Sequence, residues 1–504
     1  MRSILKRTFR KKILFLISAV LLIFLPMLIF GRDMGIPEAK AWTFPVIGNR
    51  AAVWIMAQMH ILFAAFILGT PIFVVLIEFI GYLKKDEKFE RLAHEIVKLV
   101  AMAYSFTALF GGGLLIILII LYPNLTTFLF SIYSPVMLIY IGLFLLETTF
   151  MYLYTYSWDA MSKGRLKIWH IIIGVILNVV GTLSMASMNS MAAFMLTPPK
   201  NFPDSTLWEI INNFTWMPLN FHRFIANITF GGYVVCIVSA YLYLSSKTEK
   251  DRAYYDWQGF IANLIGVGAM LPIPIMGYIY ANELYAYGAE IGVYMMSDRL
   301  SMHFELQAVV VGLLFLASNY YIWLSMKRIE GAEKYRFIIK IGFVLTFMSW
   351  CIWFAPRHFF ATMIAEPGMI SEGMELPSHL GFLALMPAKN TAAIVMVLVV
   401  IINYILYFRA LSKGKVRWGE IDPVSQYVLL FLGYLDVWLM NLMGPVRELA
   451  RKDYHVYKVV KDRTAESFAP SIDYTVLLTT IITLAFFALL TGMIFTVFKF
   501  KKAD

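Results

Sequence analysis

The sequence predicts an all-α protein, a polytopic membrane bundle of about 12 transmembrane helices. Of the 504 residues, 60% are hydrophobic and only 15% are charged, whereas soluble globular domains carry about 25% charged residues. The apolar residues also gather in about 12 runs near the ~20 residues that a helix needs to cross a bilayer. At this length in lipid, helices satisfy their own backbone hydrogen bonds, which makes a helical bundle the expected fold.

The predicted spans follow one another along the chain with mostly short connections. They lie near 13–31, 51–82, 99–122, 132–156, 168–195, 221–246, 257–281, 303–327, 337–356, 388–411, 427–446 and 473–498. We interpret residues 1–504 as one integral membrane domain with four parts. They are an extra anchor helix with an outer linker at 1–50, helices at 51–280 that carry the candidate cofactor ligands described below, an inserted helix pair at 281–387, and C-terminal helices with a basic outer loop (447–470) at 388–504.

Basic residues orient these spans. The N-terminal segment MRSILKRTFRKK is basic, and Lys and Arg collect in cytoplasmic loops. With the N-terminus inside, connections such as 83–98, 157–167 and 326–336 fall on the cytoplasmic side, as does the C-terminal KFKKAD. We therefore expect a multi-pass protein of the cell (inner) membrane with both termini in the cytoplasm. The net charge of +11 follows from this topology, so no nucleic-acid partner is expected.

The first predicted span has two interpretations. Ala39-Lys40-Ala41 has the small-x-small form of a signal-peptide cleavage site. The apolar core before it is long for a signal peptide and fits a retained anchor, which we favour.

Histidines at or inside apolar spans are the strongest functional signal. His60 lies about ten residues into one span, and His222 and His303 stand at the outer ends of two others. An imidazole in hydrocarbon is costly unless something binds it, and haem iron commonly does. We expect His60 and His222 to ligate haem iron; for His60, a structural imidazole bonded to a carbonyl is the alternative. His94, His170 and His379 are interpreted as loop or interface residues.

Carboxylates inside spans form the second signal. Glu147 lies in LLETTF and Asp436 in LGYLDVWLM; such groups are protonated, paired or part of a proton path. Glu78 follows His60 by 18 residues, which is five helical turns, so the two share a face. We expect Glu147 and Glu78 to take part in catalysis. A haem-free transporter that relays protons through Glu147 and Asp436 is an alternative function.

Glycine pairs within the spans predict close approach of a neighbour. Gly111 begins a run of three glycines, and Gly231-Gly232 follows His222 on the same span. Such positions admit either another helix or a flat macrocycle.

Four stretches resemble subunit I of the cytochrome bd-type terminal oxidases. They are MHILFAAFILG with Glu78 nine residues on, LLETTFMYLYTYSWDAMSK at 145–163, FHRFIANITFGGY at 221–233, and ELARKDYHVYKVV followed by RTAESFAPS at 448–471. The resemblance implies a haem-bearing membrane subunit that accepts electrons at the outer face and reduces oxygen to water. It also accounts for the basic outer segment 447–463, which otherwise breaks the charge rule.

The resemblance implies a role for individual residues. His60 would ligate a haem of the active-site pair and His222 the low-spin haem b. Glu147 would serve the proton path or the active-site haem pair, with Asn189 lining that pocket. The outer haem and donor region would be shaped by Glu448 and Arg451.

The sequence departs from the family at three points. The family has a haem-ligating Glu eight residues before the position of Glu147, where this chain has Ile139. The family's R-x-M motif, whose Met ligates the low-spin haem, is not clearly present; His303 or His358 could replace that Met opposite His222, or be an interfacial histidine. The inserted helix pair at 281–387 stands in place of the quinol-binding loop.

The implied cofactor is haem b, with haem d as a further candidate. The implied partners are a second membrane subunit, membrane lipid, and an electron donor that is either a quinol or a cytochrome c docking near 447–463. Because Ile139 cannot ligate iron, a second function stays open, a non-oxidase haem b anchor that passes electrons within a larger respiratory complex.

Overall fold

The structure, a computed structural model, describes residues 42–297, 300–355, 387–462 and 471–499. The predicted span at 13–31, and with it the choice between anchor and signal peptide, lies outside the described residues, as do His358 and His379.

Within the described ranges, eleven helices are long and apolar enough to cross a membrane. Each coincides with one of the other eleven predicted spans, so the all-α membrane fold is confirmed. The helices are α2 (Gly48–Lys84), α3 (Glu87–Leu121), α4 (Pro123–Tyr156), α5 (Arg165–Leu196), α7 (Trp216–Ser245), α8 (Glu249–Met270) running into α9 (Ile273–Tyr287), α11 (Ser301–Ser325), α12 (Glu333–Phe354), α14 (Pro387–Lys413), α15 (Val424–Ala450) and α16 (Ile472–Lys499). The short elements are α6 (Leu207–Ile211), α10 (Ala289–Ser297), η1 (Met326–Arg328), β1 (Tyr454–Val456) and β2 (Val460–Lys461).

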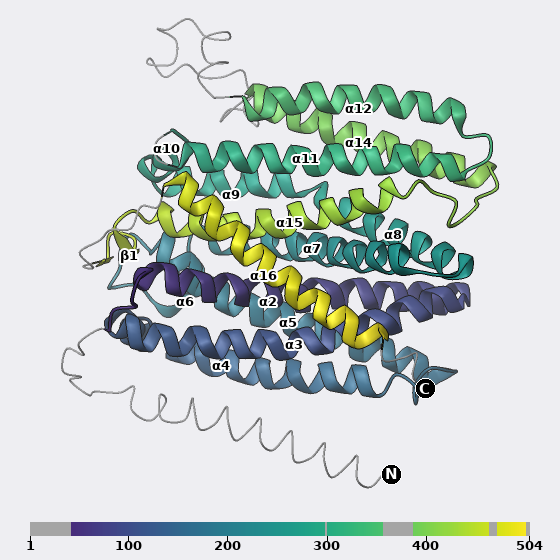
Figure 1. Ribbon diagram of the computed structural model, residues 1–504. Coiled ribbons are helices and arrows are strands. Elements are labelled where there is room, and N and C mark those ends of the chain that lie inside the picture. The colour runs from purple at the N-terminus through teal and green to yellow at the C-terminus, as the bar shows by residue number, and fades with distance from the viewer. Residues whose placement is uncertain (1–41, 298–299, 356–386, 463–470, 500–504) are drawn as a thin grey trace, which may run out of the picture.

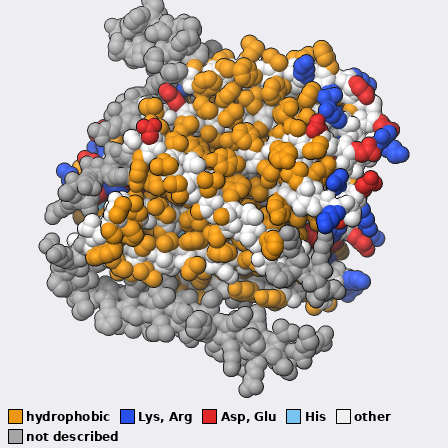
Figure 2. Space-filling view, in the orientation of Figure 1, with side chains coloured by type: hydrophobic (Ala, Val, Ile, Leu, Met, Phe, Trp, Pro, Cys, Tyr) orange, Lys and Arg blue, Asp and Glu red, His pale blue; other side chains and the backbone are white. Residues whose placement is uncertain are grey.

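The long helices form one bundle, with α3 and α4 at one edge and α12 and α14 at the other (Figure 1). The helix α16 crosses the bundle obliquely and packs on α15, α2 and α3. We name the end that carries the antiparallel β1–β2 hairpin the hairpin end, and the opposite end, where α2 joins α3 and α7 joins α8, the charged end. Lys, Arg, Asp and Glu side chains gather at the charged end, and hydrophobic side chains cover the middle of the bundle (Figure 2). This distribution fits a bundle surrounded by lipid.

Glycines bring α2 and α7 into direct backbone contact. A Cβ atom added at Gly69 would lie 1.7 Å from the carbonyl oxygen of Asn227, and one at Gly231 would lie 2.8 Å from the backbone of Gly69. Gly232 meets Gly266 of α8 in the same way, at 2.6 Å. Gly231 and Gly232 therefore serve helix packing, the first of the two uses that the sequence allowed.

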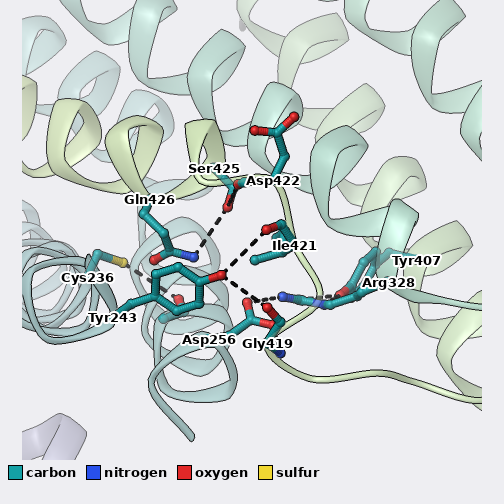
Figure 3. A network of polar contacts seen from close by, with 11 residues as sticks. Cys236, Tyr243, Asp256, Arg328, Tyr407, Gly419, Ile421, Asp422, Ser425 and Gln426 are labelled. Carbon is teal, nitrogen blue, oxygen red and sulfur yellow. Dashed lines mark hydrogen bonds and ion pairs between the residues drawn. The ribbon is translucent and has the colours of Figure 1, made fainter. Parts of the chain in front are cut away.

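A buried ion pair at the charged end connects the inserted helices, α11 and α12, to the rest of the bundle (Figure 3). Arg328, at the end of η1, which directly follows α11, and Asp256 of α8 are both fully buried and bonded to each other. Arg328 Nη2 also donates to the hydroxyl of Tyr407 in α14 at 2.6 Å, and the amide of Gly419 donates to Asp256 Oδ2 at 2.9 Å. Buried charges are tolerated when they are paired and hydrogen-bonded. The pair thus joins α8, α11, α14 and the following loop, so the inserted helices are integral to the bundle.

Candidate haem sites and a buried polar cluster

His60 is held in the orientation that an iron ligand requires. Its Nδ1 atom lies 3.1 Å from the carbonyl oxygen of Thr107 in α3. When Nδ1–H donates to a carbonyl, Nε2 keeps its lone pair for a metal, and ligating histidines are usually held in this way. Gly111 lies against the same ring, because a Cβ added there would be 2.8 Å from Cε1 of His60. This environment fits a haem ligand, although the contact with Thr107 is also what the structural alternative requires.

A cavity of about 170 Å³ lies at the hairpin end of α2, and the residues of α2 that line it fall between Arg50 and Ile61. It lies between α2, α3, α5 and α15, and its apolar wall includes Trp54, Ile61 and Leu118. Its polar lining includes Arg50, Gln58, Arg447, Glu448, Arg451 and His455. A haem has an apolar ring and two anionic propionates, so an apolar pocket rimmed by arginines suits it.

The electrostatics of this cavity favour an anionic occupant. Burial, together with repulsion from Arg447 and Arg50, lowers the pKa of Arg451 to about 9. The predicted residues Glu448 and Arg451 form an ion pair one helical turn apart. Arg50 also pairs with Asp462, with Nη2 and Oδ2 2.7 Å apart. A bound anion would stabilise the charged form of Arg451.

His222 lies one helix away from the His60 site. It stands near the hairpin end of α7 and faces α9, where a Cβ added at Gly277 would lie 3.9 Å from its Nε2. The neighbouring Arg223 donates to Asn189 Oδ1, and Asn189 Nδ2 donates to Asn220 Oδ1 at 2.7 Å. Asn189, expected in the Glu147 pocket, is thus bonded to the residue beside His222. A glycine opposite the ring and a half-buried arginine next to it are compatible with a second haem.

Among the described residues, His303 is the candidate for the ligand opposite His222. His303 is buried, and its Nε2 lies 3.3 Å from Thr475 Oγ1 of α16, whereas His222 faces α9. Its role as replacement for the missing Met stays a prediction. Ile139 is 61% exposed on α4, so the position of the family's second glutamate points away from the bundle core.

Glu147 is buried where α2, α4 and α5 meet. A Cβ added at Gly181 of α5 would lie 3.2 Å from Glu147 Oε1 and 3.1 Å from Leu68 of α2. The carboxyl group therefore points into the helix interface and away from lipid.

Glu78 belongs to a buried polar cluster near the charged end. Its Oε1 lies 2.6 Å from both Lys167 Nζ and His170 Nδ1, and its Oε2 accepts from the Tyr154 hydroxyl at 2.5 Å. Lys167 also contacts Glu90 at 2.5 Å, and the Glu90 side chain is 30% exposed. The cluster therefore connects the fully buried Glu78 carboxylate to solvent.

The interpretation of His170 as a loop or interface residue is wrong, because the side chain is fully buried and bonded at both ring nitrogens. Sequence reasoning also missed Lys167 and Tyr154. The available signal was the spacing of Lys167 and His170, which places two polar side chains on one face at the start of a span.

The basic segment 447–463 is partly neutralised within the chain. Lys452 and Lys458 both pair with Glu290 of α10, at 2.9 and 3.1 Å. These two lysines lower the pKa of Glu290 to about 2. The hairpin is thus fastened to α10 by charge.

The family resemblance was tested against known proteins. Residues 49–289, from α2 to the first residue of α10, match the family model for cytochrome bd terminal oxidase subunit I. The resemblance to cytochrome bd subunit I is confirmed. A Bacillus subtilis (strain 168) protein with the provisional name cytochrome bd menaquinol oxidase subunit I is 21% identical over 235 residues, which cover 46% of this chain. The chain spans about half the length of this curated relative, 53%.

The cytochrome bd fold extends beyond the matched segment. The solved bd oxidase from Geobacillus thermodenitrificans superimposes with a TM-score of 0.53 at 13% identity, covering 90% of this chain and 97% of that one. At this identity the comparison shows a shared helical fold. Because it covers 90% of this chain, the shared fold extends beyond residues 49–289.

Proposed function

We propose that this chain is the haem-bearing membrane subunit of a bd-like respiratory oxidoreductase that accepts electrons at the hairpin end and reduces oxygen to water. The observation that carries the proposal is the orientation of His60, whose Nδ1 faces the Thr107 carbonyl beside Gly111. The family match over 49–289 supports it.

His60 and His222 would hold haem, with haem b as the expected type and haem d as a further candidate. Bound there, haem would supply one-electron redox chemistry and oxygen chemistry. The chain itself would orient the His60 ring and place Arg50, Arg447 and Arg451 around the cavity. It would also surround the His60 and His222 rings with protein and lipid in place of bulk water.

Protons would enter at the charged end through the Glu78 cluster. Glu90 reaches solvent, Lys167 bridges it to Glu78, and Glu78 accepts from Tyr154. Tyr154 and Glu147 lie seven residues apart on α4, so they share a face about 10 Å apart. Water molecules between α2, α4 and α5 would complete the path across that gap to Glu147.

The orientation and partners of the chain are part of the proposal. The charged end would face the cytoplasm, and a second membrane subunit and lipid would cover the apolar sides. The donor would be a quinol or a cytochrome c near 447–463. The pairing of Lys452 and Lys458 with Glu290 removes positive charge from that surface and so favours a quinol.

One observation favours a second candidate, the non-oxidase haem b anchor. Ile139 carries no ligating atom and is 61% exposed on the bundle surface, so the active-site pair lacks the family's second glutamate. Such a chain would pass electrons to a partner without reducing oxygen.

A reduced-minus-oxidised optical spectrum of the purified complex, with pyridine haemochrome analysis, tests the haem assignment. His60→Ala and His222→Ala should each remove a different spectral component. Oxygen uptake with a quinol and then with reduced cytochrome c as donor separates the oxidase from the anchor. A folded complex without haem would refute both candidates.

A further inference from the structure

We propose that a second proton path, separate from the Glu78 cluster, leads from the Arg328–Asp256 pair at the charged end to the Asp436 carboxyl group inside the bundle. Hydroxyl groups of α7, α11 and α14 would form the path together with water. This inference goes beyond the proposed function, because a proton can reach Asp436 whether or not the chain holds haem.

Asp436 is the end point of the path. It is 7% exposed and lies 12 residues, about 18 Å, along α15 from Val424, the first residue of that helix. The titratable groups that interact with it electrostatically are Tyr233 and Cys236 of α7. Its Oδ2 atom has no hydrogen-bond partner within the part of the chain that the structure describes. An intramembrane carboxyl group of this kind is a candidate proton carrier.

Two tyrosine hydroxyls continue the path from Asp436 toward the charged end. The hydroxyl of Tyr233 lies 3.3 Å from Ser318 Oγ of α11. The hydroxyl of Tyr404 in α14 accepts a hydrogen bond from Asn263 Nδ2 of α8 at 2.6 Å, and Tyr404 interacts electrostatically with Tyr233. All four of these side chains are buried. Polar groups of four helices therefore meet inside the bundle, away from lipid.

The path reaches the buried ion pair through Tyr321 and Tyr407. Tyr404 interacts electrostatically with both of them. Tyr321 interacts in turn with Arg328 and Asp256, and its buried hydroxyl has no hydrogen-bond partner among the described residues. The hydroxyl of Tyr407 accepts from Arg328 Nη2 at 2.6 Å. A buried hydroxyl without a protein partner is usually satisfied by an internal water, which would connect the tyrosines.

The loop between α14 and α15 provides the entrance to the path. The amide of Gly419 in this loop donates to Asp256 Oδ2, and Figure 3 shows this contact beside Arg328. The neighbouring side chains of Arg417 and Glu420 are 52% and 65% exposed. The buried ion pair thus lies directly behind a loop that reaches solvent.

The path would move a proton without leaving a charge along the way. Each water molecule or tyrosine hydroxyl gives its proton to the next group and receives one from the group before it, so it is neutral before and after. One proton leaves the solvent at the charged end, and one arrives at the Asp436 carboxylate, which becomes a carboxylic acid. Packing of the hydroxyl groups without any proton movement is the alternative.

The test follows hydrogen–deuterium exchange of the Asp436 carboxyl group by infrared spectroscopy, in the full-length complex reconstituted in lipid nanodiscs. Asp436→Asn identifies the carbonyl band of this acid, because the variant lacks that band. Tyr404→Phe and Tyr321→Phe each remove one hydroxyl of the path and keep the ring. Tyr133→Phe is the matched control, because Tyr133 is also buried but donates to the backbone of Ser190, between α4 and α5.

We expect the wild-type band to shift in heavy water. Tyr404→Phe and Tyr321→Phe should each slow this shift by roughly tenfold, the effect of losing one hydrogen-bonding group along the path. Tyr133→Phe should exchange at the wild-type rate. Lys167→Met, which interrupts the Glu78 cluster, should do so too, because that cluster is not part of this path.

Several results would overturn the inference. One is a wild-type exchange rate in either Tyr404→Phe or Tyr321→Phe. Another is slow exchange in Lys167→Met, which would assign Asp436 to the Glu78 route. The inference also fails if Asp436→Asn removes no carbonyl band, because the group then carries no proton. If Asp436→Asn does not fold, Asp436→Glu identifies the band by its shift. A haem-free complex would refute the proposed function and leave this test in force.

Discussion

The Nδ1 atom of His60 lies 3.1 Å from the carbonyl oxygen of Thr107. This contact joins α2 to α3 within the apolar part of the bundle and leaves Nε2 as the nitrogen able to bind a metal. Gly111, one turn further along α3 than Thr107, lies against Cε1 and Nδ1 of the same ring.

The glycine beside His60 gives a sharp test of that position. Gly111→Ala places a Cβ 2.8 Å from His60 Cε1, whereas a Cβ at Gly112 meets nothing within 4 Å. We expect Gly111→Ala to displace the imidazole and to shift or reduce the haem component that depends on His60. Gly112→Ala should leave the optical spectrum unchanged. Equal spectra for the two variants would show that no ligand is held at this ring.

Lys167 should be needed for proton delivery. Lys167→Met separates Glu78 from the solvent-reaching Glu90, and we expect oxygen consumption to fall by roughly tenfold to a hundredfold. The haem spectrum should stay the same, because Lys167 contacts Glu78, which lies 18 residues, about 27 Å, along α2 from His60. Lys163→Met, in the exposed loop before α5, is the control. Normal turnover in Lys167→Met would exclude this entry route.

The ion pair between Arg328 and Asp256 should be important for stability. Arg328→Met leaves a buried carboxylate without its cation, which costs about 3–5 kcal/mol. Thermal unfolding in detergent should show a clear drop in Tm. Arg417→Met breaks only the exposed pairs with Glu330 and Glu420 and should change Tm little. If the two variants unfold at the same temperature, the buried pair does not fasten the inserted helices.

The contact between the hairpin and α10 should weaken in acid. Lys452 and Lys458 lower the pKa of Glu290 from 4.5 to about 2. A depressed carboxyl pKa contributes stability that is complete above the unfolded value and is lost as the pH falls through the folded value. Amide hydrogen exchange of 454–461 should therefore show progressive loss of protection from about pH 4.5 toward pH 2. Glu290→Gln should remove this pH dependence; if it does not, another group controls the contact.

The helices could be predicted from the sequence because a chain segment that crosses a lipid bilayer must satisfy its own backbone hydrogen bonds. The polar residues His60 and Glu147 were also recognisable, since each interrupts an apolar run. Their neighbours could be named only from the structure. In the Glu78 cluster, for example, Glu78 and His170 are in contact although they are 92 positions apart along the chain.

Two further features had no local signal. Arg328 and Asp256 are 72 positions apart, and each alone resembles an ordinary loop residue at a helix end. His455 lies in the basic segment 447–463, where the sequence shows no apolar run around it. Only the folding of the hairpin onto α2 and α5 places it at the cavity.

The backbone contact between Gly69 and Gly231 has a kinetic consequence. His60 precedes Gly69 by nine residues and His222 precedes Gly231 by nine, and both helices run from the hairpin end. Each histidine therefore stands about 13.5 Å along its helix from the same crossing point. Electron tunnelling between redox centres slows steeply as their separation grows. If His60 and His222 each hold a haem as proposed, Gly69 and Gly231 would therefore influence the rate of electron transfer between the two haems, although neither glycine contacts a histidine ring.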